Sequence, residues 1–349
     1  AHRDLHSFPT RRSSDLGMYD MSSFGKIRVE GRDAEAFLNH ICGANMSVPA
    51  GKIVYTQFLN ERAGIEADVT VTRLSETEYL VVTPAATRLA DETWMRRHAG
   101  DRNVVITDVT ASEGVLAVMG PNARKLMQAV SPNDFSNDVN PFGTAQEIEI
   151  GMGLARVHRV SYVGELGWEI YVGADQAGHI FETLWDAGQD HGLKLCGMHM
   201  MDSCRIEKAF RHFGHDITTE DNVIAAGLGF AVSTKKEAFI GRDAVLRTKE
   251  NGPDSRMVQF LLNDPEPLLY HNEPILLMSI YQNPFWLAYT CHIGSTILVH
   301  HSQLKQFLEY LDPCFDTNLQ LKCQQSQCDP SNHNSVQMIA FWCYLSILQ

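Results

Sequence analysis

The order of apolar and polar residues predicts a β-hairpin early in the chain, across residues 54–71. Two runs rich in strand-forming residues flank the polar stretch 60–64, which has the composition of a turn. From Ile65 to Val71 every second residue is apolar, and successive side chains of a strand point to opposite faces. Asp68 is therefore expected on the polar face, held at a fixed place on a rigid element.

Further strand and helix patterns continue to residue 214, in an order without a clean repeat of strand, helix and strand. This order is typical of α+β folds with antiparallel sheets. The stretch 131–142 is rich in Asn, Asp, Ser and Pro and is expected to be a loop between two halves. The remaining patterns predict strands at 25–29, 78–83, 103–109, 114–119, 146–150, 154–161 and 168–172, and helices at 33–43, 85–98, 122–130, 175–192 and 197–214.

Local signals refine the helices. Asp33 and Asp175 fit the residue that caps a helix N-terminus, where a carboxylate can accept from free backbone N–H groups. Leu89 and Trp94 are expected to form the apolar side of the helix 85–98, with Trp94 packed in the core.

A second carboxylate follows the same alternation as Asp68. Trp168, Ile170 and Val172 share an apolar face, so Glu169 and Tyr171 point the other way. A carboxylate on the polar face of a strand is usually only solvated, so neither acid indicates chemistry by itself.

Charge and composition exclude several function classes. The 349-residue chain carries a net charge of −13, which argues against nucleic-acid binding and suits a small-molecule ligand. No apolar run reaches the ~20 residues of a membrane span, so no membrane partner is expected. The eight cysteines are not spaced as a secreted disulfide framework, which favours a reducing compartment.

Both ends of the chain look foreign. Residues 1–17 contain a stretch, from His6 to Leu16, that resembles a translated sequencing adapter and is expected to be non-native. Residues 278–349 hold one glycine and five of the eight cysteines, which is unlike a β domain and suggests a non-native extension. A metal site there would use Cys323, Cys328 and His333, but their spacing lacks a Cys-x-x-Cys pair.

Several segments together carry a family resemblance that no one of them carries alone. They resemble the folate-binding aminomethyltransferase family, which includes the glycine cleavage T-protein and the C-terminal half of sarcosine and dimethylglycine dehydrogenases. The residues in these segments are most similar to those of the dehydrogenase branch. The resemblance covers about residues 19–250 and rests on the segments 65–71, 161–170, 201–208, 213–217 and 226–230.

The resemblance implies an α+β, T-protein-like folate-binding fold of antiparallel sheets with flanking helices. It implies a folate-binding domain at 18–250, with 251–277 as the start of a C-terminal barrel domain that is mostly missing. Such a module transfers a one-carbon unit from an iminium, derived from an N-methyl amine, to tetrahydrofolate, giving 5,10-methylenetetrahydrofolate. FAD would belong to a missing N-terminal domain, since no Gly-x-Gly-x-x-Gly fingerprint is present here.

The resemblance also assigns roles to four residues. Asp68 matches the family aspartate that accepts or orients the proton of the folate nitrogen and stabilises positive charge. Tyr55 and Tyr162 match folate-contacting tyrosines, and Glu169 matches the carboxylate that pairs with the amino-pyrimidine edge of the pterin. The compartment would be the cytoplasm of a bacterium or the mitochondrial matrix of a eukaryote.

Structural interpretations stay open for the same residues. Tyr55 can be strand packing, Tyr162 can cap a hairpin, and Glu169 can form a surface ion pair with Arg159. Arg205 is expected to form structural ion pairs rather than contact a substrate.

A second function also stays open. The chain could be a non-catalytic subunit with the same fold, like the regulatory subunit of pyruvate dehydrogenase phosphatase. Met201, Phe213, Val223 and Ala225 depart from family residues, and the missing barrel would leave one side of the folate cleft open. The sequence leaves the amine donor and the oligomeric state undetermined.

Overall fold

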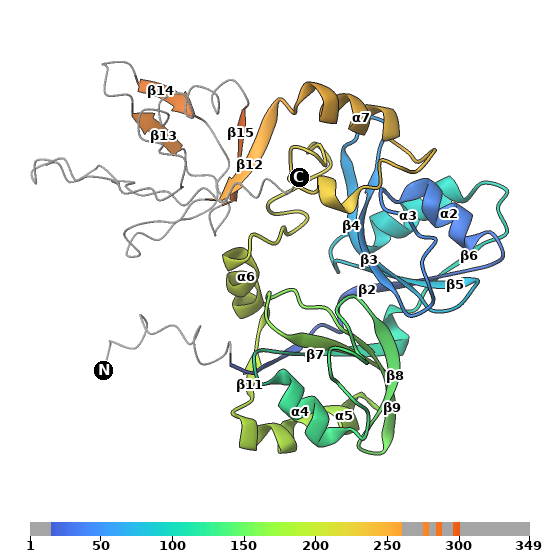
Figure 1. Ribbon diagram of the computed structural model, residues 1–349, viewed down its shortest axis with the longest axis vertical. Helices are drawn as coiled ribbons and strands as arrows, with labels where there is room; N and C mark the ends of the chain where they lie inside the picture. Colours follow the sequence, from blue (N-terminus) through green and yellow to red (C-terminus); the bar gives the residue numbers. More distant parts are fainter. Residues whose placement is uncertain (1–14, 260–274, 279–283, 288–295, 301–349) are drawn as a thin grey trace, which may run out of the picture.

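The computed structural model describes residues 15–259, 275–278, 284–287 and 296–300 of the chain, which fold around two large sheets (Figure 1). The first sheet has five strands in the order β3-β4-β5-β2-β6, and every neighbouring pair is antiparallel. Its strands are β2 (Gly25–Glu30), β3 (Ile53–Leu59), β4 (Ile65–Arg73), β5 (Glu78–Thr83) and β6 (Val105–Asp108).

The second sheet has six strands in the order β11-β1-β7-β10-β9-β8. Its neighbours are antiparallel except for β1 and β11, which run parallel. Its strands are β1 (Gly17–Asp20), β7 (Glu113–Met119), β8 (Ala145–Ile150), β9 (Gly153–His158), β10 (Gly167–Gly173) and β11 (Lys194–Cys196). The predicted class of α+β with antiparallel sheets is confirmed.

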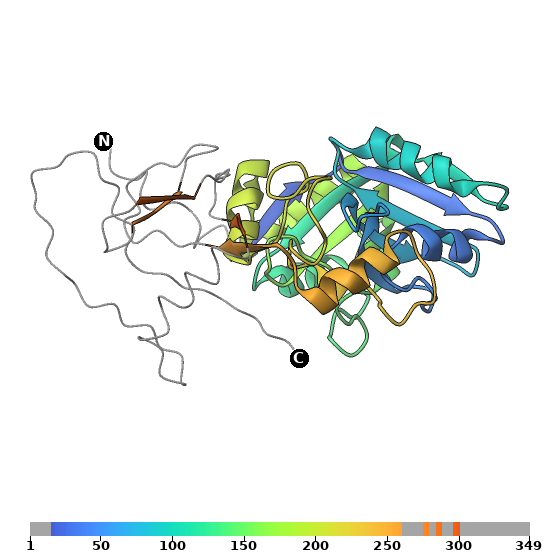
Figure 2. The ribbon, with the colours of Figure 1, turned by 90° about the horizontal axis from the view of Figure 1, so that it is seen from above.

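Each sheet is covered on one face by a pair of helices (Figure 2). On the five-stranded sheet, α2 (Ala34–Ile41) and α3 (Arg88–Ala99) contribute Phe37, Leu38 and Met95 to one core. On the six-stranded sheet, α4 (Ala123–Val130) and α5 (Ala177–Gly188) contribute to another, around the buried Trp168. Burial of these apolar faces is the main stabilising contribution to both layers.

The remaining faces of the two sheets meet in a third core. Leu80 and Val82 of β5 pack there with Tyr171 of β10 and with Met201 of α6 (Met198–Glu207). Residues of β10 are consequently buried on both faces, which the alternation in the sequence did not indicate. This inter-sheet core fixes β4 and β10 within one framework.

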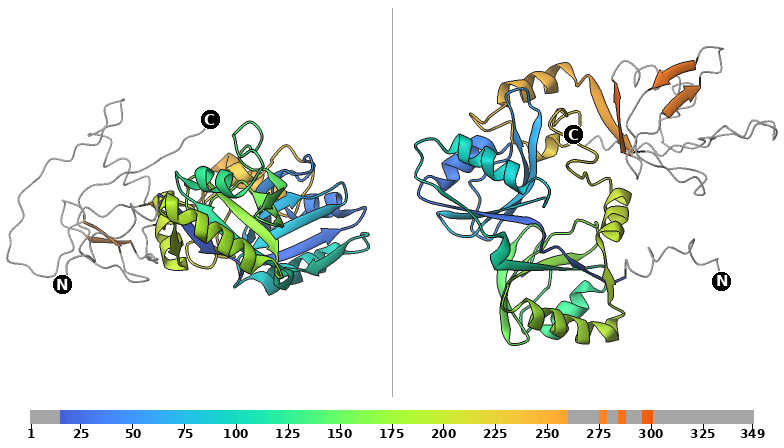
Figure 3. Two further views of the ribbon diagram at one scale, coloured as in Figure 1. Left: turned by 90° about the horizontal axis from the view of Figure 1, so that it is seen from below. Right: turned by 180° about the vertical axis from the view of Figure 1, so that it is seen from behind.

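The chain after α6 packs against the end of the β3–β4 hairpin in a fourth core. Leu59 and Ile65 of the hairpin contact an apolar set that includes Val223, Leu228 and Val245. The last of these belongs to α7 (Arg242–Asn251), which lies at the opposite end of the molecule from α4 and α5 (Figure 3). Three short 3-10 helices lie between these elements: η1 (Thr110–Ser112), η2 (Gln189–His191) and η3 (Gly229–Ala231).

Three local predictions about helices were wrong in whole or in part. The predicted helix 85–98 begins at Arg88, and Leu89 is 65% exposed instead of packed, whereas Trp94 does pack against the core. Asp33 occupies the N-cap position of α2 as predicted, but its side chain makes no cap hydrogen bond, and its Oδ2 accepts from Asn103 N at 2.7 Å instead. The residue before α5 is Gln176, so Asp175 does not occupy the capping position.

The predicted helix 197–214 is shorter, because α6 ends at Glu207 in a Schellman motif. Ala209 N donates to Ile206 O at 2.9 Å and Phe210 N donates to Arg205 O at 3.0 Å. Ala209 has a φ of 56°, the left-handed conformation that glycine usually supplies at this position. The chain is thereby turned back toward the β3–β4 hairpin.

Beyond α7, the described residues form two two-stranded sheets and no closed barrel. These pair β12 (Ser255–Gln259) with β15 (Thr296–His300), and β13 (Ile275–Met278) with β14 (Pro284–Leu287). Cys323, Cys328 and His333 lie outside the described residues.

At the other end, Leu16 is buried in the core around Trp168, and β1 begins at Gly17. The expected foreign origin of residues 1–17 and the expected domain boundaries stay predictions. Within the described ranges, no helix is both long and apolar enough to cross a membrane.

Candidate functional site

The β3–β4 hairpin places Asp68 as predicted, with its apolar neighbours buried on the other face. Gln57 of β3 is paired directly with Asp68 of β4, so the two side chains leave the sheet on the same side. Gln57 Nε2 donates to Asp68 Oδ1 at 2.8 Å. Tyr55, two residues earlier and on the same face, also interacts with this carboxylate through a hydrogen bond.

The surroundings of Asp68 change the pKa of its carboxyl group. Burial raises the pKa of the Asp68 carboxyl to about 6, although Gln57, Tyr55, Arg211 and His212 each act to lower it. A carboxyl with a pKa near 6 exchanges a proton close to neutral pH, which is what a general acid or base requires.

Tyr162 reaches the same place from the segment before β10. Its hydroxyl donates to Arg211 O at 2.8 Å, and it interacts electrostatically with Asp68 and Tyr55. Burial raises the pKa of Tyr162, so the hydroxyl stays protonated and can donate a hydrogen bond. The structure therefore brings together three of the four predicted site residues.

Exposed aromatic rings flank both tyrosines. Phe210 lies nearly parallel to Tyr162, with ring centroids 6.4 Å apart, and Phe230 lies 6.1 Å from Tyr55. Phe230 is 74% exposed, so its ring is open to solvent beside Tyr55. A flat ring system could contact these faces.

Glu169 lies apart from the other three predicted residues. It is only 8% exposed, and its Oε2 accepts from the Tyr171 hydroxyl at 2.8 Å. Burial raises the pKa of Glu169 to about 7, partly offset by that hydrogen bond. Within the described ranges, no hydrogen bond or ion pair joins Glu169 to Asp68, Tyr55 or Tyr162.

The alternative ion pair between Glu169 and Arg159 is not formed. The Arg159 guanidinium lies over the ring of Trp168, which is on the opposite face of β10, at 4.9 Å from its centroid. Arg159 Nη1 donates to Asn140 O at 2.8 Å. Glu169 is thus a buried carboxyl that has one hydrogen-bond donor, Tyr171.

The prediction that Arg205 forms structural ion pairs is confirmed. Its side chain is 1% exposed and pairs with Asp216, which is 2% exposed, and with Asp202 at 2.6 Å. Asp216 also accepts from His212 N at 2.9 Å. These contacts fix the segment after α6 that carries Arg211.

Sequence reasoning missed Gln57, Arg211 and His212 as neighbours of Asp68. Gln57 could have been found, since strand pairing around a known turn predicts which residue stands opposite Asp68. Arg211 and His212 lie in an irregular segment, where no periodicity relates sequence position to place.

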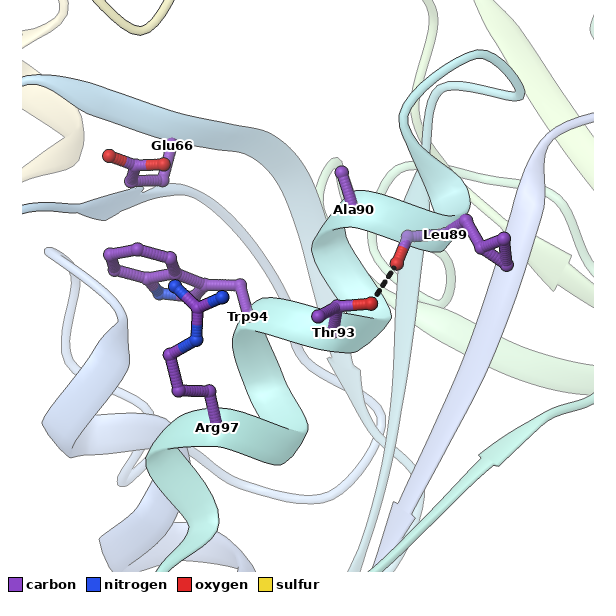
Figure 4. Close-up of a pocket in the computed structure, with 6 residues that line it drawn as sticks. All are labelled: Glu66, Leu89, Ala90, Thr93, Trp94 and Arg97. Carbon is purple, nitrogen blue, oxygen red and sulfur yellow. Dashed lines mark hydrogen bonds between the residues drawn. The ribbon is translucent and has the colours of Figure 1, made fainter.

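Two surface pockets lie apart from these residues. The larger, of about 420 Å³, lies beside α3, where Trp94 and Arg97 face Glu66 of β4 (Figure 4). The other, of about 330 Å³, is lined by the turn residues Asn60, Arg62 and Gly64 together with Thr219, Glu220 and Asn222. None of the four predicted site residues lines either pocket.

Relatives among known proteins agree with these features. Residues 10–236 match the family model described as "GCVT N-terminal domain". The chain is 43% identical over 259 residues to "4-methylaminobutanoate oxidase (formaldehyde-forming)" of Paenarthrobacter nicotinovorans, covering 74% of this chain and 31% of the relative. It is 33% identical over 257 residues to mitochondrial dimethylglycine dehydrogenase of Rattus norvegicus, covering 72% and 30%.

A solved structure shares the fold. The glycine cleavage system aminomethyltransferase T from Bartonella henselae superimposes with a TM-score of 0.68 at 24% identity, over 83% of this chain and 87% of that one. The chain spans less than a third of the length of the 4-methylaminobutanoate oxidase and of the dimethylglycine dehydrogenase. The family model covers well over half of the chain, so the protein belongs to the folate-dependent aminomethyltransferase family.

Proposed function

We propose that this chain is the tetrahydrofolate-dependent one-carbon transfer module of an enzyme like sarcosine or dimethylglycine dehydrogenase. The module would form 5,10-methylenetetrahydrofolate from an iminium donor. The observation that carries the proposal is the convergence of Asp68, Tyr55 and Tyr162, from β4, β3 and the segment before β10. The identity to an N-methyl amine oxidase and to dimethylglycine dehydrogenase supports the choice of donor.

The residues present fit a bound folate. Gln57 Oε1 is buried without a hydrogen-bond partner, and the Glu169 carboxyl has Tyr171 as its hydrogen-bond donor. An unsatisfied acceptor such as Gln57 Oε1 and a carboxylate such as that of Glu169 suit the N–H groups of a pterin. When bound, tetrahydrofolate supplies the nitrogen that accepts the one-carbon unit.

The chain would act on that ligand through charge and position. Asp68, partly desolvated, would accept the proton that the attacking folate nitrogen loses and stabilise the cationic carbon of the donor. The bond between that carbon and the donor amine would then break, and the amine would leave with the protons that the two folate nitrogens lose. Gln57 orients the carboxylate, while Tyr55 and Tyr162 offer ring faces and hydroxyls that hold the ligand beside it. The packing of the two sheets keeps these groups at fixed distances, which favours transfer over hydrolysis.

The flavin step lies outside this proposal for the chain itself. FAD would be bound by another domain of a longer protein, and the described residues of this chain would receive the iminium after oxidation. A non-catalytic role of the same fold gains no specific support, because the partly desolvated acid Asp68 serves no evident structural purpose.

A transfer assay tests the proposal. The full chain is mixed with tetrahydrofolate and an iminium made from formaldehyde and dimethylamine, and methylenetetrahydrofolate is followed with an NADP-dependent dehydrogenase. The native chain should exceed the spontaneous rate, and Asp68→Asn should return to it, since one positioned acid–base group is worth about 10²–10⁴-fold. Equal rates for the native chain and for Asp68→Asn would reject the assignment.

A further inference from the structure

Arg211 is a cation held without a carboxylate partner. Its Nη1 donates to Ala209 O at 2.8 Å, its Nε to Ala226 O at 3.0 Å, and its Nη2 to Gly227 O at 3.5 Å. In the described part of the chain, Arg211 forms no salt bridge within 4 Å. Arg211 is half-buried, and a guanidinium removed from water normally pairs with an acid, so this arrangement calls for a reason.

The backbone is shaped around this guanidinium. Ala209 adopts a φ of 56°, which costs a non-glycine residue roughly 1 kcal/mol. Gly227 has a φ of 69°, and a Cβ atom added there would lie 2.5 Å from Arg211 Nη2. Two neighbouring turns therefore adopt conformations that leave room for the side chain and direct carbonyl oxygens toward it.

The same residue is hydrogen-bonded to one of the three converging site residues and interacts electrostatically with the other two. Its carbonyl oxygen accepts the hydrogen bond from the Tyr162 hydroxyl at 2.8 Å. Its guanidinium interacts electrostatically with both Asp68 and Tyr55. The backbone carbonyls of Ala209, Ala226 and Gly227 thus hold a fixed positive charge on the side of the site that faces Asp68.

We propose that Arg211 is a positioning residue of the transfer site: its guanidinium, fixed by backbone carbonyls, keeps the Asp68 carboxylate charged, and its own carbonyl holds Tyr162. Its consequence for catalysis rests on the proposed function, whereas its effect on Asp68 does not. Arg211 is positively charged at every physiological pH.

Several groups face Asp68 from the elements packed against it, and they enter its titration. Gln57 and Tyr55 come from β3, Tyr162 from the segment before β10, and His212 from the segment after α6. Asp91 of α3 interacts with Asp68 from farther away and acts against its ionisation. Replacing Arg211 removes the permanent positive charge from the groups that surround Asp68.

The test is a titration of Asp68 in the full chain, by NMR of ¹³C-labelled aspartate carboxyls, with Asp68→Asn to assign the signal. In Arg211→Gln the midpoint should rise by about one pH unit, because an opposite charge nearby favours the ionised form. Arg211→Lys should restore part of the difference. Arg102→Gln is the matched control, since Arg102 Nη1 also donates to backbone carbonyls, at 3.1 and 3.3 Å, in another part of the fold.

An unchanged Asp68 midpoint in folded Arg211→Gln would overturn the inference. If that variant does not fold, Gly227→Ala moves the guanidinium without removing it and should raise the midpoint by a smaller amount; no rise there would equally overturn it. The readout needs no folate, so the two proposals can fail separately. A raised midpoint in a chain that binds no tetrahydrofolate sustains the role of Arg211 and rejects the proposed function.

Discussion

Gln57 and Asp68 stand directly opposite each other on β3 and β4, and Gln57 Nε2 donates to Asp68 Oδ1 at 2.8 Å. Gln57 is fully buried, so the amide has no water to exchange for the carboxylate. The hairpin therefore supplies both the acid and the group that orients it. A cross-strand pair of this kind couples the register of the sheet to the chemistry of the site.

Replacing Gln57 by Leu should raise the pKa of Asp68 above its present value of about 6, because a hydrogen bond to the charged form is lost. The acid limb of the transfer rate should move to higher pH by the same amount. Thr72→Val on β4 is the control, since the buried hydroxyl of Thr72 makes no hydrogen bond. A pH–rate profile that superimposes on that of the native chain would show that the pair is only structural.

Glu169→Gln should stabilise the fold at high pH. The pKa of Glu169 is raised in the folded state to about 7 from 4.5, so its contribution to stability is complete below about pH 4.5 and is lost as pH rises through 7. The variant removes that loss, and at pH 8 the free energy of unfolding should increase by about 1–3 kcal/mol.

Urea unfolding at pH 5 and at pH 8 measures this effect, which should be much smaller at the lower pH. An equal change at both values would mean that ionisation of Glu169 is not responsible. If Glu169 also pairs with a pterin, the same variant should bind tetrahydrofolate more weakly, so stability and function would change in opposite directions.

The ion pair of Arg205 and Asp216 should be essential for the fold. Both side chains are almost fully buried, so Asp216→Ala leaves a charge unpaired and should cost about 3–5 kcal/mol. Asp243→Ala is the matched control, because Asp243 is 83% exposed and pairs with Arg242 at 3.8 Å, an interaction worth about 0–1 kcal/mol. Similar thermal stability of the two variants would contradict this interpretation.

Ala209→Gly should stabilise the protein by about 0.5–1 kcal/mol, because glycine adopts the left-handed conformation at the end of α6 without steric cost. Ala187→Gly in the last turn of α5, where the backbone is helical, is the opposite case and should destabilise by a similar amount. Differential scanning calorimetry of the two variants tests the pair. A loss of stability in Ala209→Gly would mean that the left-handed turn at the end of α6 does not lie at residue 209.

Much of this architecture could be predicted from the sequence in those strands where apolar and polar residues alternate. The β3–β4 hairpin, the face of Asp68 and the apolar face of Trp168 follow from a period of two. The family motifs supplied Tyr162 and Glu169, which alternation alone would not single out.

Long-range packing explains what could not be predicted. Leu89 fits an apolar helix stripe, but the start of α3 extends beyond the core and leaves it exposed. Arg211 reaches Asp68 only because α6 ends in a left-handed turn at an alanine, where the sequence shows no glycine to mark it. The burial of Glu169 depends on the five-stranded sheet packing over β10, which no local pattern records.

Isothermal titration of the full chain with tetrahydrofolate tests the central claim most directly. We predict binding at one site, weakened about 10-fold or more by Tyr162→Ala, since an aromatic contact and a placed hydroxyl are lost together. Leu89→Ala, on exposed α3, should leave the affinity unchanged. Absence of binding by the folded native chain, or equal affinity in Tyr162→Ala, would contradict the assignment of this site to one-carbon transfer.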